Sequence, residues 1–399
     1  MKYRKFGSTD FKVSALGLGC MRLPVNKIFP MKVNVPDAIN LIRSAIDQGV
    51  NYLDTAWPYH FGESETVVGK ALRDGYREKV HLVSKLPMFA VSKTEDFDRF
   101  LNGQLKKLQT DHLDTYLFHS MNKNGLDKVK NLGLIDKMIE AKKNGLINHI
   151  GFSFHDTLPV FKEIVDLFDW DMVQIQYNYM DTGVQATTDG LKYAASKGMA
   201  VVIMEPLKGG TLANPPKEAK EIINSAEVKR TSVDWALQFL WNLPEVSLVL
   251  SGMGNQKMLD ENCESAKNSG IGSLNKADLN TIEQLTEIYR KKILIPCTAC
   301  QYCMPCPFGV NIPQNFAIVN NVSTESNFIF RQMLKMGYRH LTGKKSKLNK
   351  EKPNGNATIC TECGVCLEKC PQEIQIPDEL KKVNAVLGEK KKISRVFNV

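Results

Sequence analysis

The chain has 399 residues, of which 43% are hydrophobic and 24% are charged. This length exceeds what one hydrophobic core usually organises, so we expect two domains and exclude a peptide hormone, an isolated binding module and wholesale disorder. No stretch approaches the roughly 20 uninterrupted apolar residues of a membrane span, and residues 1–10 lack the apolar core of a secretory signal. We therefore predict a soluble, cytoplasmic protein with no membrane partner.

From residue 1 to about 290, apolar runs typical of strands alternate with amphipathic stretches typical of helices. The eight predicted strands are residues 15–18, 52–53, 80–83, 115–118, 147–152, 172–175, 200–203 and 248–250. The predicted helices include residues 35–48, 64–72, 94–108, 135–143, 231–241 and 256–267. Eight such units predict a (β/α)8 TIM barrel, and we expect residues 1–14 to form a hairpin that closes its bottom. The alternative is a doubly wound open sheet, but no G-x-G-x-x-G follows the first strand.

The composition changes near residue 290. Of ten cysteines, eight lie between Cys297 and Cys370. Residues 291–399 also hold 17 Lys and Arg against 8 Asp and Glu, an excess equal to the net charge of +9 of the whole chain. We therefore predict a barrel domain over residues 1–290 and a small cysteine-rich domain over residues 291–399. The two other cysteines, Cys20 and Cys263, are expected to be small buried residues.

Four polar residues follow the predicted strands. In a barrel of this kind the chemistry lies at the C-terminal ends of the strands. Asp54 follows the second strand and Tyr59 comes five residues later, while Lys85 and His119 end the third and fourth segments. Each is ordinary alone, because a loop tyrosine usually packs, a single histidine is usually structural and an Asp/Lys pair is usually a salt bridge. Their joint placement on one barrel face makes them candidate catalytic residues.

These four residues suit proton supply beside hydride transfer. A tyrosine phenol normally titrates near pH 10, so it donates its proton at neutral pH only beside a cation that stabilises the phenolate. Lys85 can be that cation, and Asp54 would hold it charged and fixed. His119 can hydrogen-bond a carbonyl oxygen and align it between Tyr59 and the hydride donor. The set therefore indicates carbonyl reduction.

Several motifs carry a family resemblance over residues 1–290. They are Leu16-Gly-Leu-Gly19, Asp54-Thr-Ala with Tyr59, Gly62-Glu-Ser-Glu65, Gly69-Lys-Ala-Leu72, Gly151-Phe-Ser153, Val173-Gln-Ile-Gln176 and residues 252–262. In these motifs the chain resembles the aldo-keto reductase family. The resemblance implies an NAD(P)-dependent oxidoreductase that reduces an aldehyde or ketone to an alcohol, with Asp54, Tyr59, Lys85 and His119 as its catalytic tetrad.

The same resemblance implies nucleotide contacts. Ser153 and Gln174 take the positions that hold the nicotinamide carboxamide. Met204 lies where many members stack an aromatic residue, and Phe154 replaces a usual Asn. The other implied contacts are Gly19, Met21, Leu207, Ser251, Gly252, Asn255 and Asn262.

The choice of dinucleotide follows from residues 251–256. This segment lacks the Lys and Arg that commonly clamp a 2′-phosphate, and only Lys257 is near. The sequence therefore favours NAD(H) over NADP(H), because bidentate Arg is the usual ligand of that charge. The alternative is that Lys257 or a distant base suffices.

Two cysteine runs form an internal duplication. They are Cys297-x2-Cys300-x2-Cys303-x2-Cys306-Pro307 and Cys360-x2-Cys363-x2-Cys366-x3-Cys370-Pro371. The runs resemble the bacterial two-cluster ferredoxins, which implies a ferredoxin-like domain with two [4Fe-4S] clusters. By that pattern one cluster uses Cys297, Cys300, Cys303 and Cys370, and the other uses Cys306, Cys360, Cys363 and Cys366. The first run is one residue short before its fourth cysteine, and residues 314–359 form an insertion with a helical stretch around residues 327–340.

Other interpretations of the tail are weighed against this one. Disulfides are disfavoured in a cytoplasmic chain, whereas four thiolates at C-x2-C spacing would also hold zinc. Nucleic acid is not an expected partner, because no basic stripe is interleaved with stacking aromatics. The basic excess would instead compensate the negative clusters. Because residues 291–399 hold few large apolar runs, we expect metal ligation to substitute for burial there.

The sequence thus supports two functions of different classes. The leading one is an NAD(P)H-linked reductase of a small-molecule carbonyl compound. The alternative is an electron-transfer protein that relays electrons between a nicotinamide, or a bound flavin, and a ferredoxin-type partner, with the clusters otherwise structural. A nicotinamide gives two electrons as hydride and a cluster accepts one, and no convincing flavin site is found to mediate the exchange, which counts against the relay.

Overall fold

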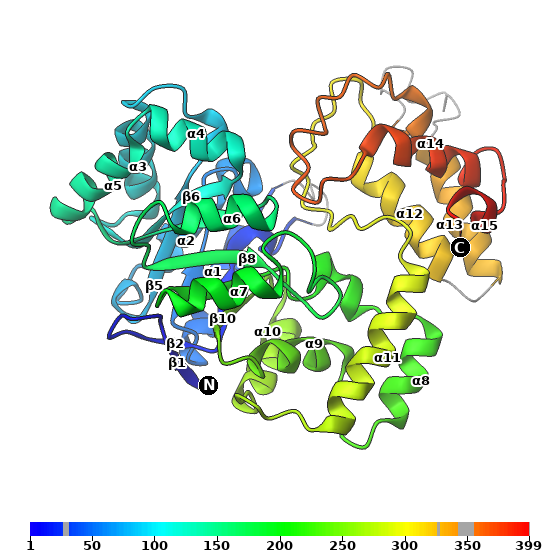
Figure 1. The fold of residues 1–399 in the computed structure, drawn as a ribbon, viewed down its shortest axis with the longest axis horizontal. Helices are drawn as coiled ribbons and strands as arrows, with labels where there is room; N and C mark the ends of the chain where they lie inside the picture. Colours follow the sequence, from blue (N-terminus) through cyan, green and yellow to red (C-terminus); the bar gives the residue numbers. More distant parts are fainter. Residues whose placement is uncertain (27–31, 325–327, 342–354, 399) are drawn as a thin grey trace. The chain divides into compact units, whose positions relative to one another are not determined.

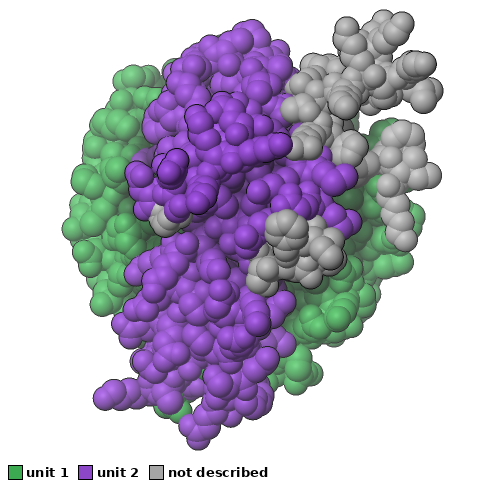
Figure 2. All heavy atoms as spheres, turned by 90° about the vertical axis from the view of Figure 1, so that its right-hand side faces the viewer, with its two compact units in different colours: residues 1–206, 233–275 green, residues 207–232, 276–399 purple. Residues whose placement is uncertain are grey.

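The computed structural model describes residues 1–26, 32–324, 328–341 and 355–398. The chain forms two compact units, which Figure 2 distinguishes by colour. The first unit comprises residues 1–206 and 233–275, and the second comprises residues 207–232 and 276–399. The second unit therefore includes a segment taken from the middle of the predicted barrel domain.

The first unit contains a closed barrel of parallel strands (Figure 1). In order around the barrel the strands are β10 (Val246–Ser251), β3 (Leu16–Gly19), β4 (Tyr52–Asp54), β5 (His81–Leu86), β6 (Leu113–Met121), β7 (Ile147–Phe154), β8 (Met172–Gln176) and β9 (Ala200–Met204). Every strand predicted from the sequence overlaps one of these. The predicted TIM barrel is confirmed, and the open sheet is excluded because β10 pairs with both β9 and β3.

The predicted hairpin is also present. Strand β1 (Tyr3–Lys5) pairs antiparallel with β2 (Lys12–Ser14). The amide of Ser8 donates to the carbonyl of Gly198, just before β9 begins. Because Phe6 and Val13 are buried in the barrel-interior cluster, the hairpin closes the N-terminal end of the barrel.

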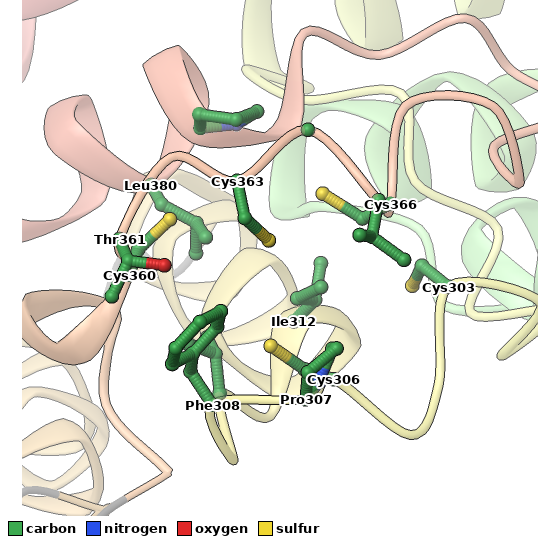
Figure 3. A pocket seen from close by; sticks show the side chains of 14 residues that line it. Cys303, Cys306, Pro307, Phe308, Ile312, Cys360, Thr361, Cys363, Cys366 and Leu380 are labelled. Atoms are coloured by element: carbon green, nitrogen blue, oxygen red, sulfur yellow. The ribbon is translucent and has the colours of Figure 1, made fainter.

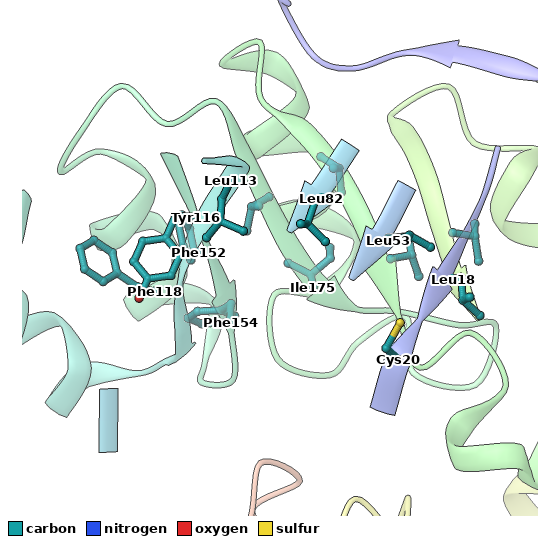
Figure 4. Close-up of a cluster of buried hydrophobic side chains, with 14 of the residues drawn as sticks. Leu18, Cys20, Leu53, Leu82, Leu113, Tyr116, Phe118, Phe152, Phe154 and Ile175 are labelled. Atoms are coloured by element: carbon teal, nitrogen blue, oxygen red, sulfur yellow. The ribbon is translucent and has the colours of Figure 1, made fainter. Parts of the chain in front are cut away.

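Helices cover the outside of the barrel. They are α1 (Val35–Asp47), α2 (Ser64–Ala71), α3 (Asp96–Leu108), α4 (Lys123–Asn131), α5 (Leu134–Lys143), α6 (Leu158–Val165), α7 (Thr187–Ser196), α9 (Ser232–Trp241) and α10 (Gln256–Lys267). Their apolar faces and the outward residues of the strands form one large cluster, which includes Leu53, Leu82, Phe152 and both Cys20 and Cys263 (Figure 4). The two isolated cysteines are buried, as expected.

The strand period then decides where the polar residues point. Tyr52, Val83 and Leu117 belong to the cluster inside the barrel. Successive side chains of a strand face opposite sides, so the residue two positions later points to the same side. Asp54, Lys85 and His119 stand two positions after these apolar residues. The backbone therefore directs all three into the C-terminal end of the barrel interior.

The second unit is helical in its described part. It contains α8 (Lys217–Ser225), α11 (Lys276–Lys292), α12 (Ile312–Thr324), α13 (Phe328–Leu341), α14 (Ile376–Leu387) and α15 (Ile393–Val396). Helix α13 matches the helical stretch predicted near residues 327–340, although residue 327 itself lies outside the described residues. No described helix of the chain is both long and apolar enough to span a membrane.

The expectation that the tail lacks a core of its own is wrong. Its described helices bury a continuous apolar cluster that includes Ile312, Phe316, Leu380, Val383 and Val386. These residues recur at helical spacing instead of in runs, so each run looks short in the sequence. The predicted domain boundary at residue 290 stays a prediction, and the compact units divide the chain differently at residues 206/207, 232/233 and 275/276.

Candidate active site and cysteine pockets

The structure brings the four predicted catalytic residues together. The Lys85 Nζ donates to Asp54 Oδ1 at 2.7 Å and to the backbone carbonyl of Thr55 at 2.9 Å. The same Nζ lies 3.2 Å from the Tyr59 Oη. The ring of His119 meets the ring of Tyr59 edge-on, with 6.0 Å between centroids. All four side chains are buried.

The turn that carries Tyr59 has an unusual backbone. After Tyr59 come three residues with positive φ, namely His60 at 51°, Phe61 at 54° and Gly62 at 89°. Only glycine adopts this region without strain, so two strained residues follow the phenol directly. His60 Nε2 accepts from the Leu23 amide at 3.1 Å, which anchors the turn to the loop after β3. Such strain persists only where surrounding contacts fix the backbone, so the turn that carries Tyr59 is held in one conformation.

Burial controls the charges in this site. It lowers the pKa of Lys85, which the carboxylate of Asp54 opposes, and it raises the pKa of Asp54, which Lys85 opposes. Burial first and the Lys85 charge second lower the pKa of His119 well below 6.5. His119 is therefore a neutral imidazole at neutral pH, and it acts as a hydrogen-bond partner instead of an acid.

The residues expected at the nicotinamide lie on adjacent strands. Ser153 on β7 pairs in register with Gln174 on β8, and both side chains are buried. Ser153 Oγ accepts from the Ser120 amide at 2.8 Å. Gln174 Nε2 lies 3.5 Å from the Met204 sulfur, while its Oε1 has no hydrogen-bond partner among the described residues. A buried acceptor without a partner suits a donor from a ligand, such as a carboxamide.

Phe154, which the resemblance places where the family usually has Asn, is an apolar core residue. Its ring packs against the ring of Phe161 with centroids 4.9 Å apart, inside the barrel-to-helix core (Figure 4). It therefore offers no polar contact in place of the family's Asn.

The segment expected to hold the adenosine end follows β10. Asn255 is the N-cap residue directly before α10, and its side chain accepts from the Met258 amide at 3.0 Å. Asn262 donates to the hydroxyl of Ser251 at 3.0 Å. Gly252 lies against Arg22, since an added Cβ would come within 3.0 Å of that side chain. The Lys257 side chain is exposed, and its Nζ lies 3.8 Å from Glu261 Oε1.

The three other residues predicted to contact the nucleotide lie on different elements of the structure. Gly19 ends β3 and stands opposite Asp54 in the sheet. Met21 is half-buried in the short helix η1 (Cys20–Arg22). Leu207 belongs to the second unit, where it precedes the turn η5 (Lys208–Ala213).

The eight tail cysteines line two pockets. One, of about 370 Å³, is lined by Cys303, Cys306, Cys360, Cys363 and Cys366 (Figure 3). The other, of about 320 Å³, is lined by Cys297, Cys300, Cys303 and Cys370. Each pocket thus gathers three cysteines of one run with the fourth cysteine of the other run, as in the resemblance to two-cluster ferredoxins, and Cys303 borders both.

The loops that carry the thiols curl through left-handed residues such as Ala299, Gln301 and Glu362. The Ala299 amide donates to the Cys297 sulfur at 3.4 Å, and hydrogen bonds to ligand sulfurs are a feature of iron-sulfur sites. The all-cysteine donor set and these loops therefore fit iron-sulfur clusters.

Comparison with known proteins decides the family of the barrel. The model of the aldo/keto reductase family matches residues 15–287, more than half of the chain. The chain belongs to the aldo/keto reductase family. A second family model, the 4Fe-4S dicluster domain, matches residues 296–376. The chain is therefore an oxidoreductase-family enzyme with an iron-sulfur domain at its C-terminal side.

Individual relatives of this aldo/keto reductase agree with the assignment. The chain is 27% identical over 308 residues to L-galactose dehydrogenase of Arabidopsis thaliana, covering 72% of this chain and 95% of that protein. It is 26% identical to an aldo/keto reductase from Klebsiella pneumoniae solved with NADP and acetate, with a TM-score of 0.60 and coverage of 71% and 95%. The holo form of aldo-keto reductase AKR11C1 from Bacillus halodurans shares the fold at 24% identity and a TM-score of 0.60, with coverage of 71% and 96%.

Sequence reasoning missed some contacts of the reductase site. The carbonyl of Thr55 accepts from Lys85, but a backbone acceptor leaves no mark in the sequence. Glu65, Ser84 and Gln104 form a buried network next to Lys85. Glu65 stood in a family motif, and nothing in that motif indicated burial beside the site.

Proposed function

We propose that this aldo/keto reductase reduces an aldehyde or ketone to an alcohol with a reduced nicotinamide nucleotide. The observation that carries the proposal is the Lys85 Nζ between Asp54 and Tyr59, at 2.7 Å and 3.2 Å. A phenol beside a buried ammonium is poised to release its proton. A reduced nicotinamide nucleotide, when bound there, would supply the hydride to the carbonyl carbon.

The side chains divide the remaining work. The Tyr59 Oη gives its proton to the carbonyl oxygen as negative charge develops there. Lys85 stabilises the resulting phenolate, and Asp54 keeps the ammonium charged in its buried place. His119, which is neutral because burial lowers its pKa, donates a hydrogen bond that aligns the carbonyl oxygen.

We propose that the nucleotide is held by those residues predicted from the family pattern that lie in the first unit. Ser153 and Gln174 would bind the carboxamide, and the unpartnered Gln174 Oε1 among the described residues supports this role. The segment around Ser251, Gly252, Asn255 and Asn262 would take the adenosine end. Since Lys257 is the one basic side chain of residues 251–257, the segment favours NADH over NADPH.

The tail would hold two [4Fe-4S] clusters. Their proposed ligands are Cys297, Cys300, Cys303 and Cys370 for one cluster and Cys306, Cys360, Cys363 and Cys366 for the other. The two pockets support this division, because each brings the members of one set together.

The proposal is tested on protein purified without oxygen. Oxidation of NADH and of NADPH is followed at 340 nm with aliphatic and aromatic aldehydes and ketones, and the alcohol product is identified. Iron, sulfide and flavin are measured on the same sample. Alcohol formation that depends on Tyr59 supports the reductase, whereas nucleotide oxidation without alcohol contradicts it.

A second candidate function is favoured by the exposed edge of one cysteine pocket. Cys363 is exposed, and Phe308 and Val365, which line the same pocket, are 46% and 42% exposed. An exposed ligand beside apolar side chains suits one-electron exchange with a ferredoxin-type partner. NADH-dependent reduction of a one-electron acceptor, lost in Cys363→Ser but kept in Tyr59→Phe, would support this relay.

A further inference from the structure

A buried carboxylate lies on the outer side of the strand that carries Lys85. Glu65 is in the first turn of α2 and its side chain is fully buried. Its Oε1 accepts from the Ser84 Oγ at 2.7 Å and from the Gln104 Nε2 at 2.6 Å. Its Oε2 lies 3.5 Å from the Nζ of Lys107 on α3. A fully buried acid is rare, because its desolvation must be offset by such partners.

This network reaches the backbone of the proposed catalytic lysine. Gln104 Nε2 also contacts the Ser84 Oγ at 2.9 Å and the Lys85 carbonyl at 3.0 Å. The Gln104 Oε1 accepts from the Tyr116 hydroxyl at 2.6 Å, which fixes the orientation of the amide. Because side chains alternate along β5, Ser84 points to the helices while Lys85 points into the barrel. Glu65 therefore fixes β5 from outside at the residue before Lys85.

The Glu65 carboxylate is one of several ionisable groups that affect the charge of Lys85. The titratable groups that face the ammonium are Asp54 from β4, Tyr59 from η2 (Tyr59–Gly62), Cys20 from η1, His119 from β6 and Glu65 from α2. Burial raises the pKa of the Cys20 thiol and lowers the pKa of His119, so both are neutral. The two carboxylates among these groups are Asp54, which pairs with Lys85 at 2.7 Å, and Glu65, which pairs with Lys107 at 3.5 Å. Burial lowers the pKa of Lys85, and both carboxylates oppose that effect, Asp54 more strongly.

We propose that Glu65 is a positioning residue that acts through Lys85. Its hydrogen bonds to Ser84 and Gln104 hold the backbone of β5 in place, and its negative charge supports the ammonium beside Tyr59. The inference rests on the proposed reductase function, and it adds a carboxylate outside the barrel to the four side chains inside. It predicts that Glu65 sets the alkaline limit of the proton transfer.

The sign of the effect follows from the charge. A negative charge near Lys85 and Tyr59 opposes deprotonation of both, so its removal allows both to lose their protons at lower pH. In Glu65→Gln the alkaline limb of kcat should therefore move down by about 0.5–1 pH unit. At a pH above the new limb, kcat should fall roughly 3- to 10-fold with little change in KM.

A second variant should shift the alkaline limb of kcat in the opposite direction, and it can be used if Glu65→Gln does not fold. Lys107 is the cation that faces Glu65 from α3, and its side chain is 33% exposed. Lys107→Met should move the alkaline limb upward, by less than the shift in Glu65→Gln, because an exposed charge is screened. Ser84→Ala removes two hydrogen bonds, the one to Glu65 and the one from Gln104, and keeps the carboxylate, so it should lower the melting temperature without moving the limb.

The matched control is Asp96→Asn. Asp96 is 4% exposed and begins α3, where its carboxylate accepts from Ser92 and Lys93 amides and from Arg99. The change neutralises another carboxylate of low exposure that is not among the groups facing Lys85. Asp96→Asn should lower the free energy of unfolding, and its pH profile of kcat should equal that of the wild type.

A titration that needs no activity separates this inference from the proposed function. The protein is labelled with ring-¹³C tyrosine, and the Tyr59 signal is identified by its loss in Tyr59→Phe. We expect this signal to titrate at lower pH in Glu65→Gln and at higher pH in Lys107→Met than in the wild type. A shift without any carbonyl reduction would overturn the proposed function and uphold the inference. Unmoved titration in a folded Glu65→Gln, or shifts of the same sign in both variants, would overturn the inference.

Discussion

The barrel and the cysteine-bearing tail position their functional groups in different ways. In the barrel, each strand is paired on both sides, and Asp54, Lys85 and His119 are aimed by the strand period. In the tail, the cysteines lie on irregular loops between helices, and several loop residues have positive φ. Strand geometry therefore directs the side chains of the barrel site, whereas the tail cysteines lie on loops whose direction no described strand sets.

The largest expected effect concerns the barrel side. Tyr59→Phe removes the proton donor and leaves the strands that position the site unchanged. Carbonyl reduction should fall by about 10²- to 10⁴-fold, the usual contribution of a general acid, while the melting temperature and nucleotide affinity stay close to wild type. Steady-state kinetics with the best carbonyl substrate and a fluorescence titration with NADH check both parts.

Lys85→Met provides the control on the assigned roles. Because Lys85 acts through the phenol, the double variant should be little worse than either single variant. Losses that multiply would mean that the two residues serve separate steps. Unchanged turnover in Tyr59→Phe would remove Tyr59 from the mechanism altogether.

The tail side of the comparison is tested by Cys363→Ser. Cys363 is exposed on a loop, and its proposed cluster has no sheet to hold it in place. Iron should fall from about eight to about four per chain in oxygen-free protein, with loss of visible absorbance. Since the described tail helices bury their own core, proteolysis should increase at residues 360–370 and leave α12 and α14 protected.

Cys263→Ser is the matched control, because this cysteine is buried on α10 in the barrel unit and lines neither pocket. Its iron content should equal that of the wild type. Wild-type iron near four per chain would implicate the short-spaced Cys306 or a single cluster. Cleavage throughout the tail of Cys363→Ser would mean that the cluster, and not the helical core, holds this unit together.

The comparison also explains what the sequence could predict. Buried parallel strands are continuous apolar runs, so all eight were placed, and their ends located Asp54, Lys85 and His119. The tail core was missed because residues such as Phe316 and Leu380 are spaced along helices whose packing is not visible locally. The left-handed turn at His60 and Phe61 was missed for another reason. Most histidines and phenylalanines have negative φ, so the pair does not predict this turn, and the conformation depends on contacts such as the one with Leu23.

A smaller effect is expected where a glycine meets a cysteine loop within the second unit. Gly209 has a φ of 66°, and an added Cβ would lie 2.2 Å from the Thr298 carbonyl, between Cys297 and Cys300. Gly210 has a φ of 97° with no atom within 4 Å of its added Cβ. Both alanine variants carry backbone strain of about 1–2 kcal/mol, and the clash should add about 1–3 kcal/mol to Gly209→Ala alone.

Melting curves and iron analysis distinguish these two glycines. Gly209→Ala should lower the melting temperature by several degrees more than Gly210→Ala, at roughly 2–4 °C for each kcal/mol. It should also lose iron more readily to a chelator, because the loop of Cys297 must shift. Equal melting temperatures and equal iron loss in the two variants would mean that the loop of Cys297 moves away from the added methyl group at no cost in stability. The contact between Gly209 and this loop would then not help to position the cysteines.

The smallest expected effect concerns the preference of the barrel for NADH or NADPH. The wild type should bind NADH at least as tightly as NADPH, because residues 251–256 offer no basic clamp for a 2′-phosphate. Gly254 leaves room for one, since among the described residues its added Cβ comes closest to the Arg22 carbonyl oxygen, at 3.4 Å. Gly254→Arg should therefore tighten NADPH binding roughly tenfold, the value of one charge-assisted contact, and leave NADH binding unchanged. Fluorescence titrations with both nucleotides measure this, and Lys257→Ala is the control. If the wild type prefers NADPH and Lys257→Ala abolishes that preference, the exposed Lys257, released from Glu261, is the phosphate ligand and the NADH assignment is wrong.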